Sequence, residues 1–111
     1  MSETPRVRWR MTLQELCHRT GATPADLERW ARLGALGPRW KETTENRWRH
    51  ITRAAATRAV IMRRLVDTGM TEEAAAGVAD SSADTLMRGD KLTLLTRAGR
   101  MTLDPALLDL P

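Results

Sequence analysis

The side chains best suited to chemistry in this sequence are its basic groups, which could bind a polyanion. Sixteen of the 18 basic residues are arginine, and positions 1–70 hold fourteen basic and seven acidic residues, a net charge of +7. Positions 71–111 hold four basic and seven acidic residues, a net −3. A GC-rich coding sequence also produces an arginine bias, so composition alone does not decide function. The uneven charge favours a polyanion-binding face in the first two thirds of the chain and a separate role for the remainder.

Patterns of catalytic or metal-binding residues are not found in the sequence. It has no Gly-rich phosphate loop, HExxH, CxxC or GxSxG motif. His18 and His50 lack metal-ligand spacing with Cys17 or with each other, and Cys17 on a helix face is more simply a small apolar residue. We therefore expect a protein that is not an enzyme and that holds no cofactor or metal.

Cysteine usage and hydropathy indicate where the protein works. A single cysteine allows no disulfide within the chain, which fits a reducing cytoplasm. No apolar run approaches the ~20 residues of a membrane-spanning helix, and the N-terminus lacks the apolar core of a signal peptide. We expect a cytoplasmic protein that does not contact membranes.

These basic residues must be positioned by helices, and the helix signals are clearest from residue 11 onward. Thr12 with Glu15 has the spacing of a reciprocal cap, and Gly21 is placed to end that helix. Thr23 and Pro24 begin a second helix, which Gly34 closes. Two short helices joined by a tight turn form the scaffold that presents one helix to a DNA major groove. The expected core stripes are Leu13, Leu16 and Cys17, then Leu27, Trp30 and Ala31, with Leu33 and Leu36 following.

Residues 37–51 lack a helical period and predict a two-stranded wing. Glu45-Asn46 offers the turn, and the returning strand alternates up to Ile51. Trp40 and Trp48 could stack on nucleobases, although packing is the commoner role in a chain without Phe or Tyr. Further helices are expected from Thr52 to Asp67 and, in a short form, from Thr71.

The remaining segments are an arm and a tail. Residues 1–10 are expected to form a loose N-terminal arm, residues 11–80 the main domain, and residues 81–111 a short tail after a Ser81-Ser82 linker. Residues 91–96 and 100–103 predict a β-hairpin, and Asp104-Pro105 predicts a final helical turn. An isolated hairpin is marginal in water, so this tail must pack on its own helices, on a second copy or on a partner.

Several of these motifs together resemble the winged helix-turn-helix of the MerR family. The resemblance covers roughly residues 11–79 and implies a mainly α fold with a short β wing, to which the tail adds a hairpin. It implies a small sequence-specific DNA-binding protein of bacterial or phage origin, associated with the nucleoid and acting as a homodimer or cooperative assembly on double-stranded DNA. The matching residues are Thr12-Leu13-x-Glu15-Leu16, Gly21-x-Thr23, Leu27-x-x-Trp30, Leu33-Gly34-x-Leu36, Trp48-Arg49-x-Ile51-Thr52 and Leu65-x-x-x-Gly69-Met70-Thr71-x-Glu73.

The resemblance and the basic wing together give eight candidate DNA-contacting residues. The second helix would enter the major groove, and the wing would grip the backbone beside it. The candidates are Arg29, Arg32, Arg39, Lys41, Arg47, Arg49, Arg53 and Arg58.

Two features depart from the family and keep alternatives open. Asp26 and Glu28 occupy the presumed reading face, where they would repel phosphate, although a carboxylate can accept from a cytosine amino group. A short acidic tail replaces the family's long dimerisation helix, so sensing of a metal or drug is not expected. The alternatives to a transcriptional regulator are a phage-type excisionase or DNA-packaging factor, which share the fold, and a protein-interaction module that contacts its partner through residues 90–111.

Overall fold

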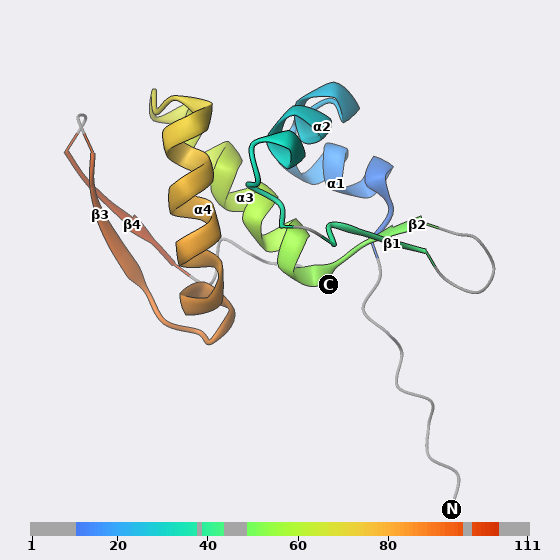
Figure 1. Cartoon of the computed structure of the whole chain (residues 1–111). Coiled ribbons are helices and arrows are strands. Elements are labelled where there is room, and N and C mark those ends of the chain that lie inside the picture. Colours follow the sequence, from blue (N-terminus) through green and yellow to red (C-terminus); the bar gives the residue numbers. More distant parts are fainter. Residues whose placement is uncertain (1–10, 38, 44–48, 97–98, 105–111) are drawn as a thin grey trace, which may run out of the picture.

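Threonine caps set where the helices begin. In the computed structural model, which describes residues 11–37, 39–43, 49–96 and 99–104, the described helices are α1 (Leu13–Thr20), α2 (Pro24–Arg32), α3 (Arg53–Asp67) and α4 (Glu72–Met87) (Figure 1). Each follows a threonine whose hydroxyl accepts from the backbone N–H three residues on. The glycine predicted to end α1 is left-handed, with a φ of 71° at Gly21. Local sequence signals therefore place these helix ends correctly.

The expected wing is present, and it is anchored by a residue from outside it. β1 (Lys41–Thr43) and β2 (Arg49–Ile51) pair antiparallel, with Lys41 opposite Ile51. Met11 adds a bridge on the other side, because the backbone N–H of Ile51 donates to its carbonyl at 2.8 Å. Met11 and Ile51 are both buried. The wing is therefore tied to the start of α1, while the turn predicted at Glu45-Asn46 and the side chain of Trp48 lie outside the described residues.

Helices α3 and α4 form the largest helix–helix interface, which is built from small side chains. Buried alanines line it from both helices, and Leu65, Met62 and Leu86 fill the space around them. Small residues allow two backbones to approach closely, and burial of these alanines leaves little room for a larger side chain. The buried alanines are Ala55, Ala56 and Ala59 of α3 and Ala75, Ala76, Ala79 and Ala83 of α4.

The apolar stripes of the first two helices are buried largely as predicted. Leu16, Leu27, Trp30 and Leu36 are fully buried. Leu33, which was expected on the same stripe, is 37% exposed, because it is the C-terminal cap of α2 and the chain turns there. The apolar stripe therefore stops with the helix and resumes after the turn.

Helix α4 is longer than the sequence predicts. The expected Ser81-Ser82 linker is wrong: both serines lie inside α4, where Ser82 is buried and the Ser81 hydroxyl donates to the Gly77 carbonyl at 3.1 Å. Because that hydroxyl donates to a carbonyl of the preceding turn, Ser81 is accommodated within the helix. The expected boundary after residue 80 thus falls in the middle of a helix.

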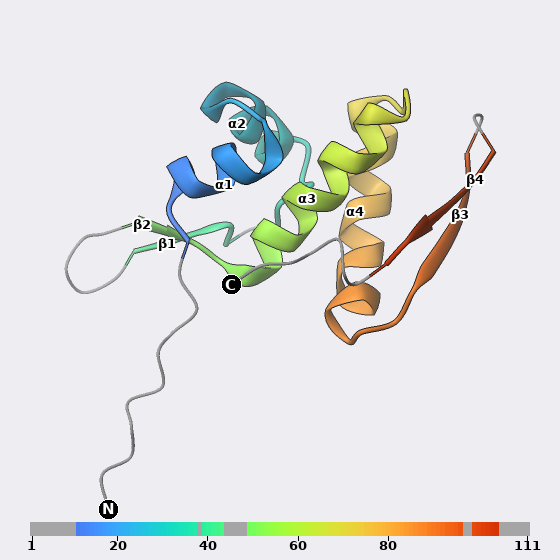
Figure 2. The ribbon, with the colours of Figure 1, turned by 180° about the vertical axis from the view of Figure 1, so that it is seen from behind.

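The predicted β-hairpin is confirmed and folds back on the helices. β3 (Leu92–Thr96) and β4 (Gly99–Leu103) pair antiparallel, and one face packs on the core through Leu103 and half-buried neighbours. On the other face Leu95 is 85% exposed. Figures 1 and 2 show the hairpin on the side of the α3–α4 pair away from α1 and α2. The helical turn expected after Asp104 lies outside the described residues, as does the N-terminal arm.

The alanine interface makes a direct prediction for stability. Ala79→Leu should lower the free energy of unfolding by about 1–3 kcal/mol, because the added carbons have no space between α3 and α4. Ala74→Leu makes the same change at an exposed position of α4 and should stay within about 0.5 kcal/mol of the parent protein. Urea unfolding followed by circular dichroism measures both, and equal effects would contradict close packing at this interface.

Candidate nucleic-acid interface

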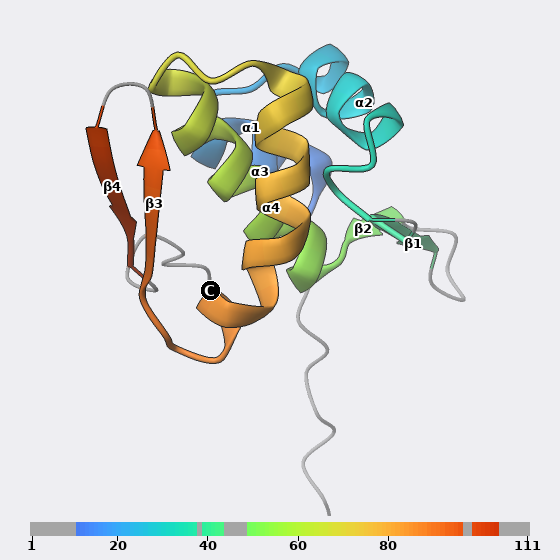
Figure 3. The same ribbon diagram turned by 60° about the vertical axis from the view of Figure 1, so that its left-hand side comes forward.

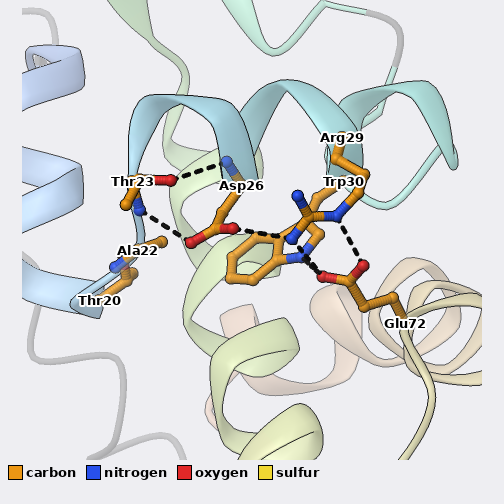
Figure 4. Close-up of polar contacts among 7 residues, drawn as sticks. All are labelled: Thr20, Ala22, Thr23, Asp26, Arg29, Trp30 and Glu72. Carbon is orange, nitrogen blue, oxygen red and sulfur yellow. Dashed lines mark hydrogen bonds and ion pairs between the residues drawn. The ribbon is translucent and has the colours of Figure 1, made fainter.

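The start of α2 is fixed by a reciprocal cap that explains one of its acidic residues. The Asp26 backbone N–H donates to the Thr23 hydroxyl at 3.1 Å, and the Thr23 backbone N–H donates to an Asp26 carboxylate oxygen at 3.0 Å (Figure 4). These bonds satisfy two backbone donors that a helix start leaves unpaired. They hold the pKa of Asp26 below its usual range, with a further contribution from Arg29. Asp26 is thus a capping residue of α2.

The other Asp26 carboxylate oxygen belongs to a cluster that ties α2 to α4. Arg29 donates to Asp26 at 2.7 Å and grips Glu72 with two bonds of 2.7 and 2.9 Å. The buried Trp30 ring donates its indole N–H to the same Glu72 carboxylate at 2.6 Å (Figure 4). Hydrogen bonds from Arg29, and then from Trp30, lower the pKa of Glu72, while Glu72 and Asp26 raise that of Arg29.

This cluster was not predicted from the sequence. Arg29 and Trp30 were assigned to opposite roles, one to DNA and one to the core, and Glu72 lies 42 residues beyond Trp30. No local pattern links them. The Thr23–Asp26 spacing, by contrast, is a local capping signal that could have identified the role of Asp26.

The acidic residue next to this cap is paired with the wing. Lys41 of β1 donates to Glu28 of α2 at 2.6 Å, and its ammonium group lies 4.2 Å from the centre of the Trp40 ring. Trp40 is half-buried against the core, so its packing role is confirmed. The Glu28–Lys41 pair therefore joins α2 to β1 and neutralises both charges.

A further candidate, Arg58 of α3, is incorporated into the protein interior. Its side chain is only 18% exposed and lies 3.4 Å from the carboxylate of Asp80 on α4. Its guanidinium also covers Gly37 so closely that a Cβ at that position would collide with Nη1. Gly37 has a φ of 84°, so both the backbone and the neighbouring arginine favour glycine there. Arg58 holds the turn before the wing against α3 and α4.

Three candidates are exposed, and their guanidinium groups make no hydrogen bond or ion pair with another described residue. They come from three elements of the same region: Arg32 ends α2, Arg39 lies in the turn before β1, and Arg53 begins α3. Figure 3 shows α2 and the wing on one side of the α3–α4 pair and the hairpin on the other. Arg49 lies in β2 opposite Thr43, whereas Arg47 and the Arg49 side chain are outside the described part.

Other reactive side chains do not gather into a site. Burial raises the pKa of the half-buried Cys17 thiol, and the charge of Asp26 raises it further, so the thiolate is disfavoured. In the described ranges no group of three His, Cys, Asp or Glu residues could hold a metal ion. Among those same residues, no helix is both long and apolar enough to cross a membrane.

The helix pair, the wing and the third helix match one known family. A model of the MerR HTH family of regulatory proteins matches residues 11–82. The chain belongs to the MerR family. The match ends within α4, so the hairpin lies beyond the family region. Members of the MerR family are DNA-binding regulators, which agrees with the helix-turn-helix and wing described above. No curated protein and no solved structure matches the chain.

The Glu72 cluster predicts a specific dependence of stability on pH. Folding lowers the pKa of Glu72 from its ordinary value of 4.5. The carboxylate therefore contributes to the free energy of unfolding above pH 4.5, and this contribution is lost as the pH falls through the lower pKa of the folded state. Glu72→Gln should lower stability at pH 7 by roughly 1 kcal/mol and make the loss of stability between about pH 5 and 2 less steep.

Glu73→Gln is the matched control for this experiment. Glu73 is the exposed neighbour on α4, and its replacement should leave both the stability at pH 7 and its acid dependence nearly unchanged. Urea unfolding midpoints of the parent protein and both variants, measured between about pH 5 and 2, test this prediction. A Glu72→Gln curve parallel to that of the parent protein would contradict the role of the carboxylate.

Proposed function

We propose that this protein is a sequence-specific DNA-binding transcriptional regulator that places α2 in the major groove and its wing along the neighbouring backbone. The observation that carries the proposal is the MerR family match over the helix-turn-helix and wing. The exposed cations Arg32, Arg39 and Arg53 support it, because they surround α2 and the wing and are not engaged by acidic residues of the described chain.

The acidic residues of α2 are compatible with this function because both are already paired. Asp26 is bound by Arg29 and by the cap, and Glu28 is bound by Lys41. The repulsion that an isolated carboxylate would exert on phosphate is therefore reduced at both positions. Because these ion pairs leave α2 close to neutral, the helix itself would attract DNA only weakly. The surrounding arginines would bind phosphates and so hold α2 in the major groove.

The eight candidate residues divide into two roles in this proposal. Arg32, Arg39, Arg53 and, on the wing, Arg47 and Arg49 would contact phosphates or bases. Arg29, Lys41 and Arg58 would act as positioning residues, because each is bound to an acidic residue of another element. Two copies would bind a repeated site, since a single module of this size buries little surface on DNA. Such a protein would work in the cytoplasm, in contact with the nucleoid.

The arginines that we propose contact DNA give the main test. A random-sequence DNA selection supplies the binding site, and a salt titration then compares variants. Arg53→Ala, Arg32→Ala and Arg49→Ala should each weaken binding and lower the salt slope by about 1, because each phosphate contact releases counterions. Arg100→Ala on β4 removes the same charge from the opposite side of the molecule and should leave both quantities unchanged. The absence of any binding at low salt would overturn the proposal.

The paired acid Glu28 gives a second test with the opposite sign. Glu28→Gln should tighten binding to non-specific DNA by about two- to tenfold at low salt, since it removes a negative charge and releases Lys41. Asp84→Asn makes the same charge change on the exposed far half of α4 and should have no effect. Fluorescence anisotropy measures both. A selective loss of the preferred sequence would instead assign Glu28 to reading a base.

A further inference from the structure

A groove runs between α3 and the hairpin, on the side of the molecule away from α2 and the wing. It consists of two adjoining hollows of about 160 and 350 Å³ that share Arg64 and Asp67 of α3 as walls. The smaller hollow reaches from the end of α1 to Leu86 and Leu103, and the larger one follows residues 99–102 of β4. Together they form an extended open channel, in contrast to the enclosed cavities that bind small molecules.

The groove walls are strongly basic. Arg19, Arg63, Arg64 and Arg100 line it, and Asp67 is the acidic residue among its lining. Asp67 is paired with Arg63 at 3.2 Å. Arg64 and Arg100 are exposed and make no ion pair with another described residue. This arrangement differs from α2, where the acids match the nearby cations, and it leaves two guanidinium groups open to an anionic partner.

The base of the smaller hollow is apolar. Ile61, Leu86 and Leu103 are buried in the core and contribute to its lining, and Val60 is half-buried beside them. An apolar side chain entering this hollow would cover carbon surface while its neighbours met the arginines at the rim. The groove therefore combines charge complementarity with one apolar subsite.

A strand edge borders the larger hollow. The hairpin contains two strands, so β4 is paired with β3 on one edge, and no described strand pairs with its other edge. Arg100, Met101 and Thr102 of β4 form the wall facing Arg64, Asp67 and Thr68. A strand edge that has no neighbouring strand can accept another extended chain.

We propose that this groove binds an extended acidic segment of a partner protein, which adds as a strand beside β4. An acidic side chain on the outer face of that segment pairs with Arg100, and its inner face carries an acidic side chain toward Arg64 and an apolar residue that enters the hollow above Leu86 and Leu103. The open shape favours an extended peptide over a small molecule, and the lack of open acids in the lining favours a partner richer in acids than this basic chain. The proposal is independent of DNA binding, because the hairpin that borders the groove and α2 lie on opposite sides of the α3–α4 pair (Figure 3).

Peptides of defined pattern test the groove on the full chain. The probe is a fluorescein-labelled eight-residue peptide that carries glutamate on both faces of an extended strand and valine at two positions of one face. It should bind with saturable anisotropy, and its glutamine counterpart should bind at least about tenfold more weakly because the charge-assisted bonds are lost. Arg64→Gln and Arg100→Gln should each weaken binding of the acidic peptide by about fivefold. Arg32→Gln removes an equally exposed charge from the far side and should have no effect.

The backbone contribution is tested separately. A peptide with the same side chains but N-methylated at every second residue cannot complete the strand pairing and should lose most of its affinity. Equal binding of the methylated and unmodified peptides, or equal losses in Arg32→Gln and Arg64→Gln, would overturn the proposal. Sedimentation that shows a dimer of the free chain broken by Arg64→Gln would also overturn it, because a second copy would then occupy the groove. Circular dichroism confirms that each variant is folded.

Discussion

The arrangement of this molecule depends on one carboxylate, that of Glu72. It lies at the first position of α4 and accepts two hydrogen bonds from Arg29 and one from the indole of Trp30. Trp30 is buried on the inner face of α2, so the same carboxylate satisfies a polar group at the core boundary and a charged group at the surface. This fixes how α2 sits on the α3–α4 pair. Since the hairpin packs on that same pair, α3 and α4 position both α2, which we propose reads DNA, and the proposed peptide groove.

Ion pairs such as the one between Arg29 and Glu72 change what the net charge implies about the surface of the protein. The net charge of positions 1–70 suggests a uniformly basic surface, but the structure divides its cations into two groups. Arg29, Lys41 and Arg58 are bound to acids on neighbouring elements and fix the positions of those elements. Among the described cations without an ion pair to another described residue, Arg32, Arg39 and Arg53 lie near α2 and the wing, and Arg64 lines the groove beside β4. A paired guanidinium can approach phosphate only by giving up its partner, so the unpaired ones are the better candidates for binding.

What could be predicted from the sequence was local. Threonine caps, terminal glycines, the wing and the hairpin each depend on residues a few positions apart, and the structure confirms them. The continuity of α4 was missed because Gly77, Ser81 and Ser82 weaken helix propensity, while packing of its alanines on α3 compensates. The partners of Arg29 and Arg58 were missed for a different reason. Glu72 and Asp80 each lie more than 20 residues from the arginine that they bind, and no spacing rule links residues brought together only by packing.

The hairpin packs on the helices through one face, and this packing leaves one edge of β4 without a neighbouring strand in the described residues. Two strands alone are marginal in water, so β3 and β4 must bury their inner leucines on the helices to be stable, as Leu103 does. That burial orients β4 so that residues 99–102 form a wall opposite Arg64 and Asp67 of α3. A third strand could stabilise the hairpin further, yet the described chain supplies none. The inner face is thus buried by folding, while no described strand pairs with the other edge of β4, which Arg64 and Arg100 border. In the proposed complex, an acidic segment at this edge would pair with both arginines and complete the strand pairing of β4 at the same time.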